Sequence, residues 1–195
     1  RSTPDGHTLL MATTGVMAIN NALYRNMTYD AAGDLLPVIF AASITNVLAV
    51  PVDLPPKSVP ELITLAKRQP GTLSFASSGA GSSTHLSGEL FKSLTGVDLI
   101  HIPFKGSGQA LIDVVAGRVS MIFDNMPSAL PHIKGGKLRA LGVTGSKRSG
   151  ALPDVPTIAE AGVPGYESLS WSGIAVAAAT PTPSPHTGSS SRLRP

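Results

Sequence analysis

Hydrophobic runs of strand length alternate along this chain with segments of helical periodicity, and Gly, Pro, Ser or Asn residues separate them. Alternation of this kind is typical of βα units, so it predicts an α/β fold with a mostly parallel sheet. The predicted strands are 7–13, 72–77, 98–104, 119–123, 138–144 and 169–178. The predicted helices are 17–24, one opened by Ser58, one carrying Leu86, Leu90 and Leu94, 109–116, 126–133 and a short one at 157–162.

Two segments depart from this alternation. The apolar run Leu36 to Val52 is too rich in β-branched and small residues for a helix, and it is longer than an ordinary strand of about 5 to 6 residues. Such a run can pass from one domain into another. Residues 180–195 are nearly all Pro, Thr, Ser, Gly and Arg, so we expect a loose tail that buries too little apolar surface to fold.

Composition excludes several classes of function. The 195 residues carry Lys+Arg 15 against Asp+Glu 12, a net charge of +3, with no basic run and few aromatic residues, so nucleic acid is not an expected partner. Cysteine is absent, which excludes thiolate metal sites, cysteine nucleophiles and disulfides. No apolar stretch reaches the roughly 18 to 20 residues of a membrane span.

The most informative polar segment is residues 77–84, Ser-Ser-Gly-Ala-Gly-Ser-Ser-Thr, which we call the serine loop. It follows a predicted strand and opens a helix, where free N–H groups and hydroxyls can hold an anion. The other interpretation is an ordinary loop with one hydroxyl capping the helix. Because a cap needs only one hydroxyl and several are present, the anion site is favoured.

The spacing Gly79-x-Gly81-x-x-Thr84 resembles a dinucleotide fingerprint, which also requires an acidic residue at the end of the next strand. Asp98 has nearly the right spacing but stands at the beginning of its strand, so a nicotinamide cofactor is disfavoured. The histidines show no metal-ligand spacing, and the P-loop and nucleophile-elbow motifs do not occur. We therefore expect no cofactor and no metal.

Other polar residues follow predicted strands and point to the same sheet edge. Asp124 and Asn125 close one strand, where a carboxylate can receive a ligand amine or hydroxyl, or can cap the following helix. Lys105 either attracts an anion or is a solvated loop lysine, and the second interpretation is favoured. The turn Thr13-Thr14-Gly15 is a weaker copy of the serine loop.

His85 lies beside the serines and raises a different class of function, an α/β hydrolase or transferase with Ser82 or Ser83 as the nucleophile. Adjacent residues on one helix turn do not face each other, and no third group is visible to orient the imidazole. A structural role in the first helical turn is therefore favoured. The enzyme stays open as an alternative, and so does a non-functional fragment.

An ordered series of motifs covers the chain from about Pro4 to Thr180. The motifs are 4–10 (PDGHTLL), 18–20 with 23–24, 79–86 (GAGSSTHL), 103–106 (PFKG), 123–127 (FDNMP) and 152–162 (LPDVPTIAEAG). Together they resemble the Bug (TctC-like) solute receptors of tripartite tricarboxylate transporters. The resemblance implies a bacterial periplasmic binding protein with a type II-like fold, in which two α/β lobes joined by crossing hinge strands close on a small carboxylate without catalysis. It also implies membrane transporter subunits as partners, and we expect a monomer.

The resemblance also assigns residues. It places Thr13, Thr14 and Gly15 on the first lobe's side of the ligand, and Asp124 and Asn125 against the variable part of the ligand. The second lobe's carboxylate loop contains Ser77, Ser78, Gly79, Ser82, Ser83 and Thr84. The implied division is 1–42 for a remnant of the first lobe, 43–172 for a nearly complete second lobe, 173–179 for the return strand and 180–195 for the tail.

Family members are longer at both ends. The resemblance therefore implies an incomplete first lobe, through truncation or a reading-frame shift, and weak binding of carboxylates by this chain. Any export signal is expected to have been removed or to lie upstream of Arg1.

Overall fold

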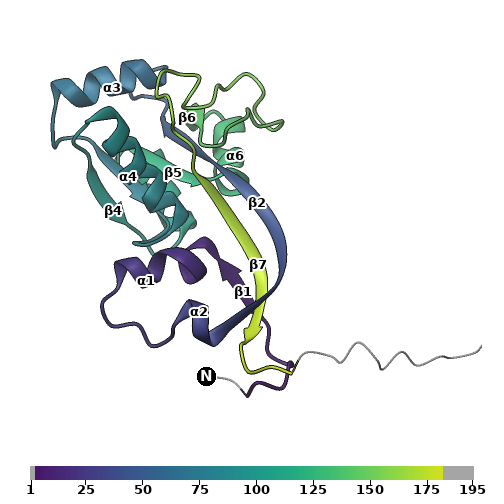
Figure 1. Ribbon diagram of the computed structural model, residues 1–195. Helices are drawn as coiled ribbons and strands as arrows, with labels where there is room; N and C mark the ends of the chain where they lie inside the picture. The colour runs from purple at the N-terminus through teal and green to yellow at the C-terminus, as the bar shows by residue number, and fades with distance from the viewer. Residues whose placement is uncertain (1–2, 182–195) are drawn as a thin grey trace, which may run out of the picture.

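One long strand, β2 (Leu35–Pro51), runs between the two regions of the molecule, as the apolar run at 36–52 predicts (Figure 1). In this computed structural model, which describes residues 3–181, β2 pairs along residues 35–45 with β7 (Leu169–Ala177). Along residues 46–51 it pairs instead with β5 (Met121–Asn125) and β6 (Leu138–Val143). The strand therefore changes partners at residues 45 and 46. Most of the predicted tail, from residue 182 on, lies outside the described residues.

The C-terminal half of β2 belongs to an α/β/α sandwich, which we define as residues 46–168. Its sheet also contains β3 (Ser74–Ser77) and β4 (Ile100–Pro103), and its helices are α3 (Val59–Arg68), α4 (Ser83–Thr95), α5 (Ser107–Val115) and α6 (Met126–Lys134). Side chains of successive strand residues point to opposite faces. Leu48, Phe75 and Phe123 accordingly pack with α3 and α4, whereas Val47, Ala76 and Ile122 pack with α5 and α6. Both faces of this sheet are buried.

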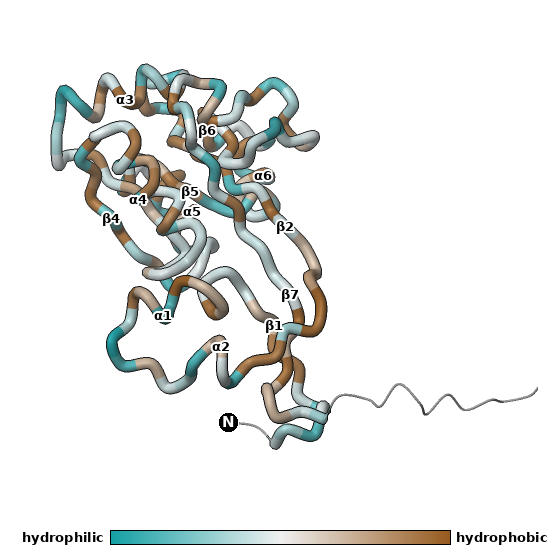
Figure 2. The backbone as a smooth tube through the Cα atoms, viewed as in Figure 1, coloured by the Kyte–Doolittle hydropathy of each residue, from teal (hydrophilic) through white to brown (hydrophobic). Residues whose placement is uncertain are grey.

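The other half of β2 lies in a three-stranded antiparallel ribbon, which we define as β1 (Leu10–Thr13), β7 and residues 35–45 of β2. The short helices η1 (Gly15–Ile19), α1 (Asn20–Leu23) and α2 (Ala31–Asp34) accompany it. Figure 2 shows that this part of β2 is strongly apolar, yet Ile39 and Phe40 are each 63% exposed. An open cavity of about 770 Å³ also lies beside the ribbon, and none of the predicted site residues lines it.

Two predictions about the fold are wrong. The sheet is mixed, because among the described strands only β3 pairs in parallel, with β4 and β5, whereas β2 and β7 form antiparallel pairs. Hydrophobic periodicity reports the spacing of side chains and carries no information on strand direction. The helix predicted at 157–162 is a set of turns, although its capping hydrogen bonds between Thr157 and Glu160 form at 3.0 Å.

The remaining predicted strands and helices are confirmed with shifts of a few residues at their ends. In α4 the buried face differs from the leucine pattern, because Leu86 and Leu94 are exposed while Ser87, Gly88 and Phe91 are buried. Gly88 is needed there, since a Cβ at this position would overlap the Phe75 ring. Within residues 3–181, no helix combines the length and the apolar character that crossing a bilayer requires.

Candidate functional site

The parallel strands β3, β4 and β5 bring three chain segments to one edge of the sandwich sheet. Ser77 is in register with Pro103, so the segments that follow these residues lie side by side. Gly106 N–H donates to Ser78 O at 3.1 Å, and Ser107 Oγ donates to Asp124 Oδ1 at 2.5 Å. The serine loop, the start of α5 and the end of β5 therefore form one contiguous set of polar groups, as the sequence predicts.

Most hydroxyls of the serine loop are hydrogen-bonded within the loop itself. Thr84 Oγ1 accepts from Ser78 N–H at 3.0 Å and lies 2.8 Å from Ser82 Oγ. Ser82 Oγ also caps α4 by accepting the His85 N–H at 3.2 Å. Gly79 (φ +148°) and Gly81 (φ +77°) adopt backbone conformations that favour glycine. The hydroxyls thus shape the loop.

The groups left to hold an anion are main-chain N–H groups. The first hydrogen bond inside α4 joins Leu86 N–H to Ser82 O at 3.1 Å. The N–H groups of Ser83 and Thr84 precede it, so the helix provides them with no acceptor. They occupy the positive end of a 13-residue helix. The sequence predicts both N–H groups and hydroxyls for an anion site, and in the structure most of the hydroxyls are already engaged within the loop.

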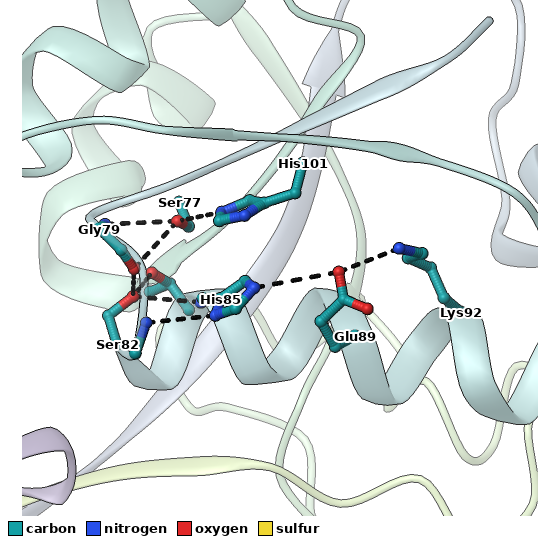
Figure 3. A network of polar contacts seen from close by, with 9 residues as sticks. Ser77, Gly79, Ser82, His85, Glu89, Lys92 and His101 are labelled. Carbon is teal, nitrogen blue, oxygen red and sulfur yellow. Dashed lines mark hydrogen bonds and ion pairs between the residues drawn. The ribbon is translucent and has the colours of Figure 1, made fainter. Parts of the chain in front are cut away.

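A histidine that sequence reasoning missed lies beside the loop, next to Ser77 and His85 (Figure 3). His101 of β4 places Nε2 2.7 Å from the buried Ser77 Oγ, and its ring stacks on Phe75 at 4.8 Å and on His85 at 4.0 Å between centroids. Burial, reinforced by the neighbouring His85, lowers the pKa of His101 to about 4. Only the register that places Phe75 opposite His101 reveals this stack, so no sequence signal marked it.

His85 is engaged with the loop backbone. Its Nδ1 accepts the Gly81 N–H at 3.2 Å, while Ser82 Oγ donates to Gly79 O at 2.7 Å. The imidazole that a serine nucleophile would need at this position is therefore occupied by another partner. This geometry favours the structural role over a Ser–His nucleophile pair.

Asp124 and Asn125 lie at the end of β5, beside the loop. Asp124 is fully buried, and burial raises the pKa of its carboxyl group. Asp124 Oδ2 and Asn125 Oδ1 are buried without a hydrogen-bond partner among residues 3–181. Asn125 occupies the position before α6, but its side chain makes no capping hydrogen bond. Both oxygens are therefore buried acceptors that no donor in the described part of the chain uses.

The turn at Thr13–Gly15 meets the serine loop from the ribbon side. Thr14 Oγ1 accepts from Trp171 N–H at 3.0 Å, which holds the turn against β7. A Cβ on Gly15 would lie 3.0 Å from Gly81 O, and Tyr24 Oη donates to Ala80 O at 3.3 Å. The turn and α1 therefore contact the loop directly. Lys105, in contrast, is an exposed loop residue.

One protein family matches most of this chain. Residues 1–184 match the tripartite tricarboxylate transporter family receptor, TctC. The protein BugT of Bordetella pertussis is 38% identical over 172 residues, which are 88% of this chain and 53% of BugT. The structure of R. palustris Rpa4515 with adipate is 44% identical, with a TM-score of 0.90 over 93% of this chain and 61% of that one.

A second solved structure is MatC (Rpa3494) from Rhodopseudomonas palustris with bound malate, at 33% identity and a TM-score of 0.85 over 92% of this chain and 61% of that one. The chain thus spans about half the length of the curated relative and three fifths of the solved chains. The two solved structures are similar to this chain in both fold and sequence. The chain belongs to the TctC family, the receptors of tripartite tricarboxylate transporters, which includes the Bug proteins.

Proposed function

We propose that this chain is part of a periplasmic receptor that holds a small carboxylate and delivers it to a tripartite tricarboxylate transporter, without catalysis. The observation that carries the proposal is the convergence of the α4 N-terminus and Asp124 at one sheet edge, with Gly15 touching the loop from the other region. Such an arrangement offers donors to a carboxylate and acceptors to the rest of the same ligand.

The α4 N-terminus cannot bind a carboxylate tightly alone. A helix N-terminus carries about half a positive charge, worth about 0.3 to 1 kcal/mol when exposed and about 2 kcal/mol when partly buried. Micromolar affinity needs about 8 kcal/mol. Charge-assisted hydrogen bonds from Ser83 and Thr84 N–H, at about 1.5 to 3 kcal/mol each, must be added, and they reach such values only where water is excluded. The Thr13–Gly15 turn supplies part of that exclusion.

The remainder of the ligand is proposed to face Asp124 and Asn125. Their unpartnered oxygens accept hydrogen bonds, so they suit a hydroxyl or an ammonium group, and a second carboxyl group when it is protonated. The hydroxyls of Ser77, Ser78 and Ser82 make hydrogen bonds inside the loop, two of them to the Gly79 carbonyl, so in this proposal they shape the backbone that presents the amides rather than touching the ligand. This assignment refines the site predicted from the sequence.

Ligand entry requires the turn and the loop to separate, because they are in contact. The strands β2 and β7 join the two regions, and a buried polar chain ties both to α4. Asn46 Nδ2 donates to Ser87 Oγ at 3.1 Å, and Ser87 Oγ lies 2.9 Å from Ser168 Oγ, just before β7. We propose that the strands bend at this point and that α4 follows the sandwich.

The relatives support this proposal. One similar structure was solved with adipate and another with malate, both dicarboxylates. A related structure is described as the periplasmic binding protein BugD. The family name connects these receptors with a tripartite transporter. Localisation, transporter partners and the monomeric state of this chain are part of the proposal.

Ser83→Pro tests the role of the amides. Ser83 is the first residue of α4, where proline fits, and Ser82 has the extended backbone (φ −80°, ψ 163°) that a following proline requires. The substitution removes one N–H and keeps the helix. Titration of the ¹⁵N-labelled chain with adipate is expected to show a loss of affinity of about 10- to 100-fold, the equivalent of one charge-assisted hydrogen bond.

Ser83→Ala is the matched control, because it removes the hydroxyl and keeps the N–H, and its affinity is expected to stay near that of the wild type. Adipamide is the uncharged control ligand. Shifts at residues 78–84 and 124–125 that appear with adipate and not with adipamide support the site. Shifts confined to other residues, or an equal loss in both Ser83 variants, would falsify it. Hydrolysis of a test ester that disappears in Ser82→Ala would favour the enzyme instead.

A further inference from the structure

Gly81 is the point where the serine loop meets the other region of the molecule. A Cβ on Gly81 would lie 2.8 Å from Leu23 Cδ2 and 3.2 Å from Asn20 Oδ1, and Gly81 O lies against Gly15. The orientation of the Gly81 peptide therefore determines how the loop fits against α1 and the turn.

One hydrogen bond fixes that orientation and also fixes the tautomer of a histidine. The Gly81 N–H donates to His85 Nδ1 at 3.2 Å, so Nδ1 must carry no proton. The proton of the neutral ring is then on Nε2, which lies 3.9 Å from Glu89 Oε1 (Figure 3). A protonated imidazole carries hydrogen on both nitrogens, so the same geometry would set two N–H groups against each other.

The ring cannot turn freely to avoid this conflict. The His85 side chain is 14% exposed and its ring stacks on His101, with centroids 4.0 Å apart and planes inclined by 20°. His101 is itself held between Phe75 and the Ser77 hydroxyl. The stack therefore fixes the plane of the His85 ring, and the hydrogen bond from the Gly81 N–H selects the ring edge that carries Nδ1.

We infer that His85 is a positioning residue of the serine loop, and that protonation of its imidazole releases the Gly81 N–H and loosens the loop from the opposing α1 and turn. This inference rests on the proposed function for its consequence, a weaker hold on carboxylates in acid. The receptor would then release its ligand more readily as the pH falls.

The groups around His85 determine the pH at which its imidazole is protonated. Burial lowers the pKa of His85, Lys92 lowers it further, and Glu89 opposes both. From β4, His101 stacks on the ring, so a second positive charge on the pair would lie about 4.0 Å from the first. Tyr24, the residue after α1, contributes a hydroxyl group that donates to Ala80 O. Protonation of His85, and with it the loosening of the loop, is therefore expected below the ordinary pH range of histidine titration.

Two substitutions distinguish the role of Nδ1 as a hydrogen-bond acceptor from the role of the His85 ring in the stack. His85→Asn can place an amide oxygen near the position of Nδ1 and cannot be protonated, whereas His85→Phe keeps the stack and removes the acceptor. His7→Gln, which changes an exposed histidine of the other region, is the matched control. Each chain is titrated with adipate from about pH 7.5 to about pH 4.5, across the range in which histidine changes charge.

At pH 7.5 we expect His85→Phe to bind adipate about 3- to 10-fold more weakly than the wild type, the equivalent of one neutral hydrogen bond. His85→Asn is expected to bind nearly as well as the wild type there. As the pH falls, the affinity of the wild type relative to His85→Asn should fall. Adipate and Asp124 change protonation in both experiments, so their contributions cancel in this ratio. A ratio that stays constant, or a His85→Phe variant that binds like the wild type, overturns the inference.

A measurement without ligand separates this inference from the proposed function. The ¹⁵N shifts of the neutral His85 ring are expected to show an unprotonated Nδ1, and the Gly81 amide proton shift should follow the titration of that ring. A neutral ring with its proton on Nδ1, or a Gly81 amide that ignores the titration, overturns the inference even if adipate binds. If both signals behave as expected and adipate does not bind, the proposed function fails and the positioning role of His85 stands.

Discussion

The two halves of β2 have similar sequences and opposite environments. Residues 36–43 and 46–51 are both mainly aliphatic, yet every residue of the first segment is exposed and every residue of the second is buried. Both halves pair with antiparallel neighbours, and both contain shifts of register. Hydrophobic, β-branched residues thus favour the strand in both halves, while the helical layers of the sandwich bury only one of them.

This difference in burial shows that a segment can form a strand without burying its apolar side chains, and burial is what contributes most to stability. In the sandwich, α3 and α4 cover one face of the sheet and α5 and α6 cover the other, so the apolar side chains of β2, β3 and β5 in this sheet lose contact with water. In the ribbon, the side chains of Val38, Ile39 and Phe40 remain about 60% exposed. Truncating a side chain should therefore have very different effects in the two regions.

The largest effect is expected from a matched pair of phenylalanines. Phe123 is fully buried against Phe75 and Phe91, so Phe123→Ala should lower the free energy of unfolding by about 3 to 5 kcal/mol. Phe40→Ala should change it by less than about 0.5 kcal/mol, because little contact is lost. Urea unfolding followed by circular dichroism measures both. Equal losses would mean that the ribbon face is covered in solution, and the comparison would be wrong.

An intermediate effect is expected from two helical glycines of the sandwich. In α4, Gly88→Ala would force a methyl group against the Phe75 ring, so it should destabilise the chain by about 1 to 3 kcal/mol. In α5, no atom lies within 4 Å of the Cβ position of Gly108. Gly108→Ala should therefore stabilise by up to about 1 kcal/mol through helix propensity.

Thermal unfolding of the two glycine variants tests whether the packing of α4 on β3 is as close as the structure shows. A Gly88→Ala variant that is as stable as the wild type would contradict it.

The effect that is smallest at neutral pH concerns stability in acid. The pKa of His101 is about 4 in the folded chain, below the ordinary histidine value of about 6.5, so the unfolded state binds more protons between these values. The contribution of His101 to stability is therefore complete above about pH 6.5 and is lost as the pH falls toward about 4. His101→Phe keeps the ring stack and should make stability less dependent on pH in this range.

Urea midpoints for the wild type and His101→Phe across the same pH range measure this effect, with His7→Gln as the exposed-histidine control. Identical pH profiles for the wild type and His101→Phe would show that His101 binds its proton as readily in the folded chain as in the unfolded chain, which would contradict the lowered pKa.

Local sequence determined most of the elements and part of the site. The capping residue Ser82, the glycines at 79 and 81 and the strand before them specify a tight βα turn wherever this segment folds, because their conformational preferences act within a few residues. The position of Asp124 at a strand end was also predictable, since the apolar run before it stops there. The assignment of these residues to a ligand remains a prediction.

Only the tertiary structure decided which groups are available. Pairings between distant segments determine which part of β2 is buried and which strands lie antiparallel to it. They also bring His101 into contact with Ser77. Side-chain periodicity does not encode these pairings. The same is true of His85, whose neighbours in the sequence suggested a serine partner and whose actual partner is a backbone amide. Short-range preferences fix local conformation, whereas burial and long-range register determine which polar groups meet.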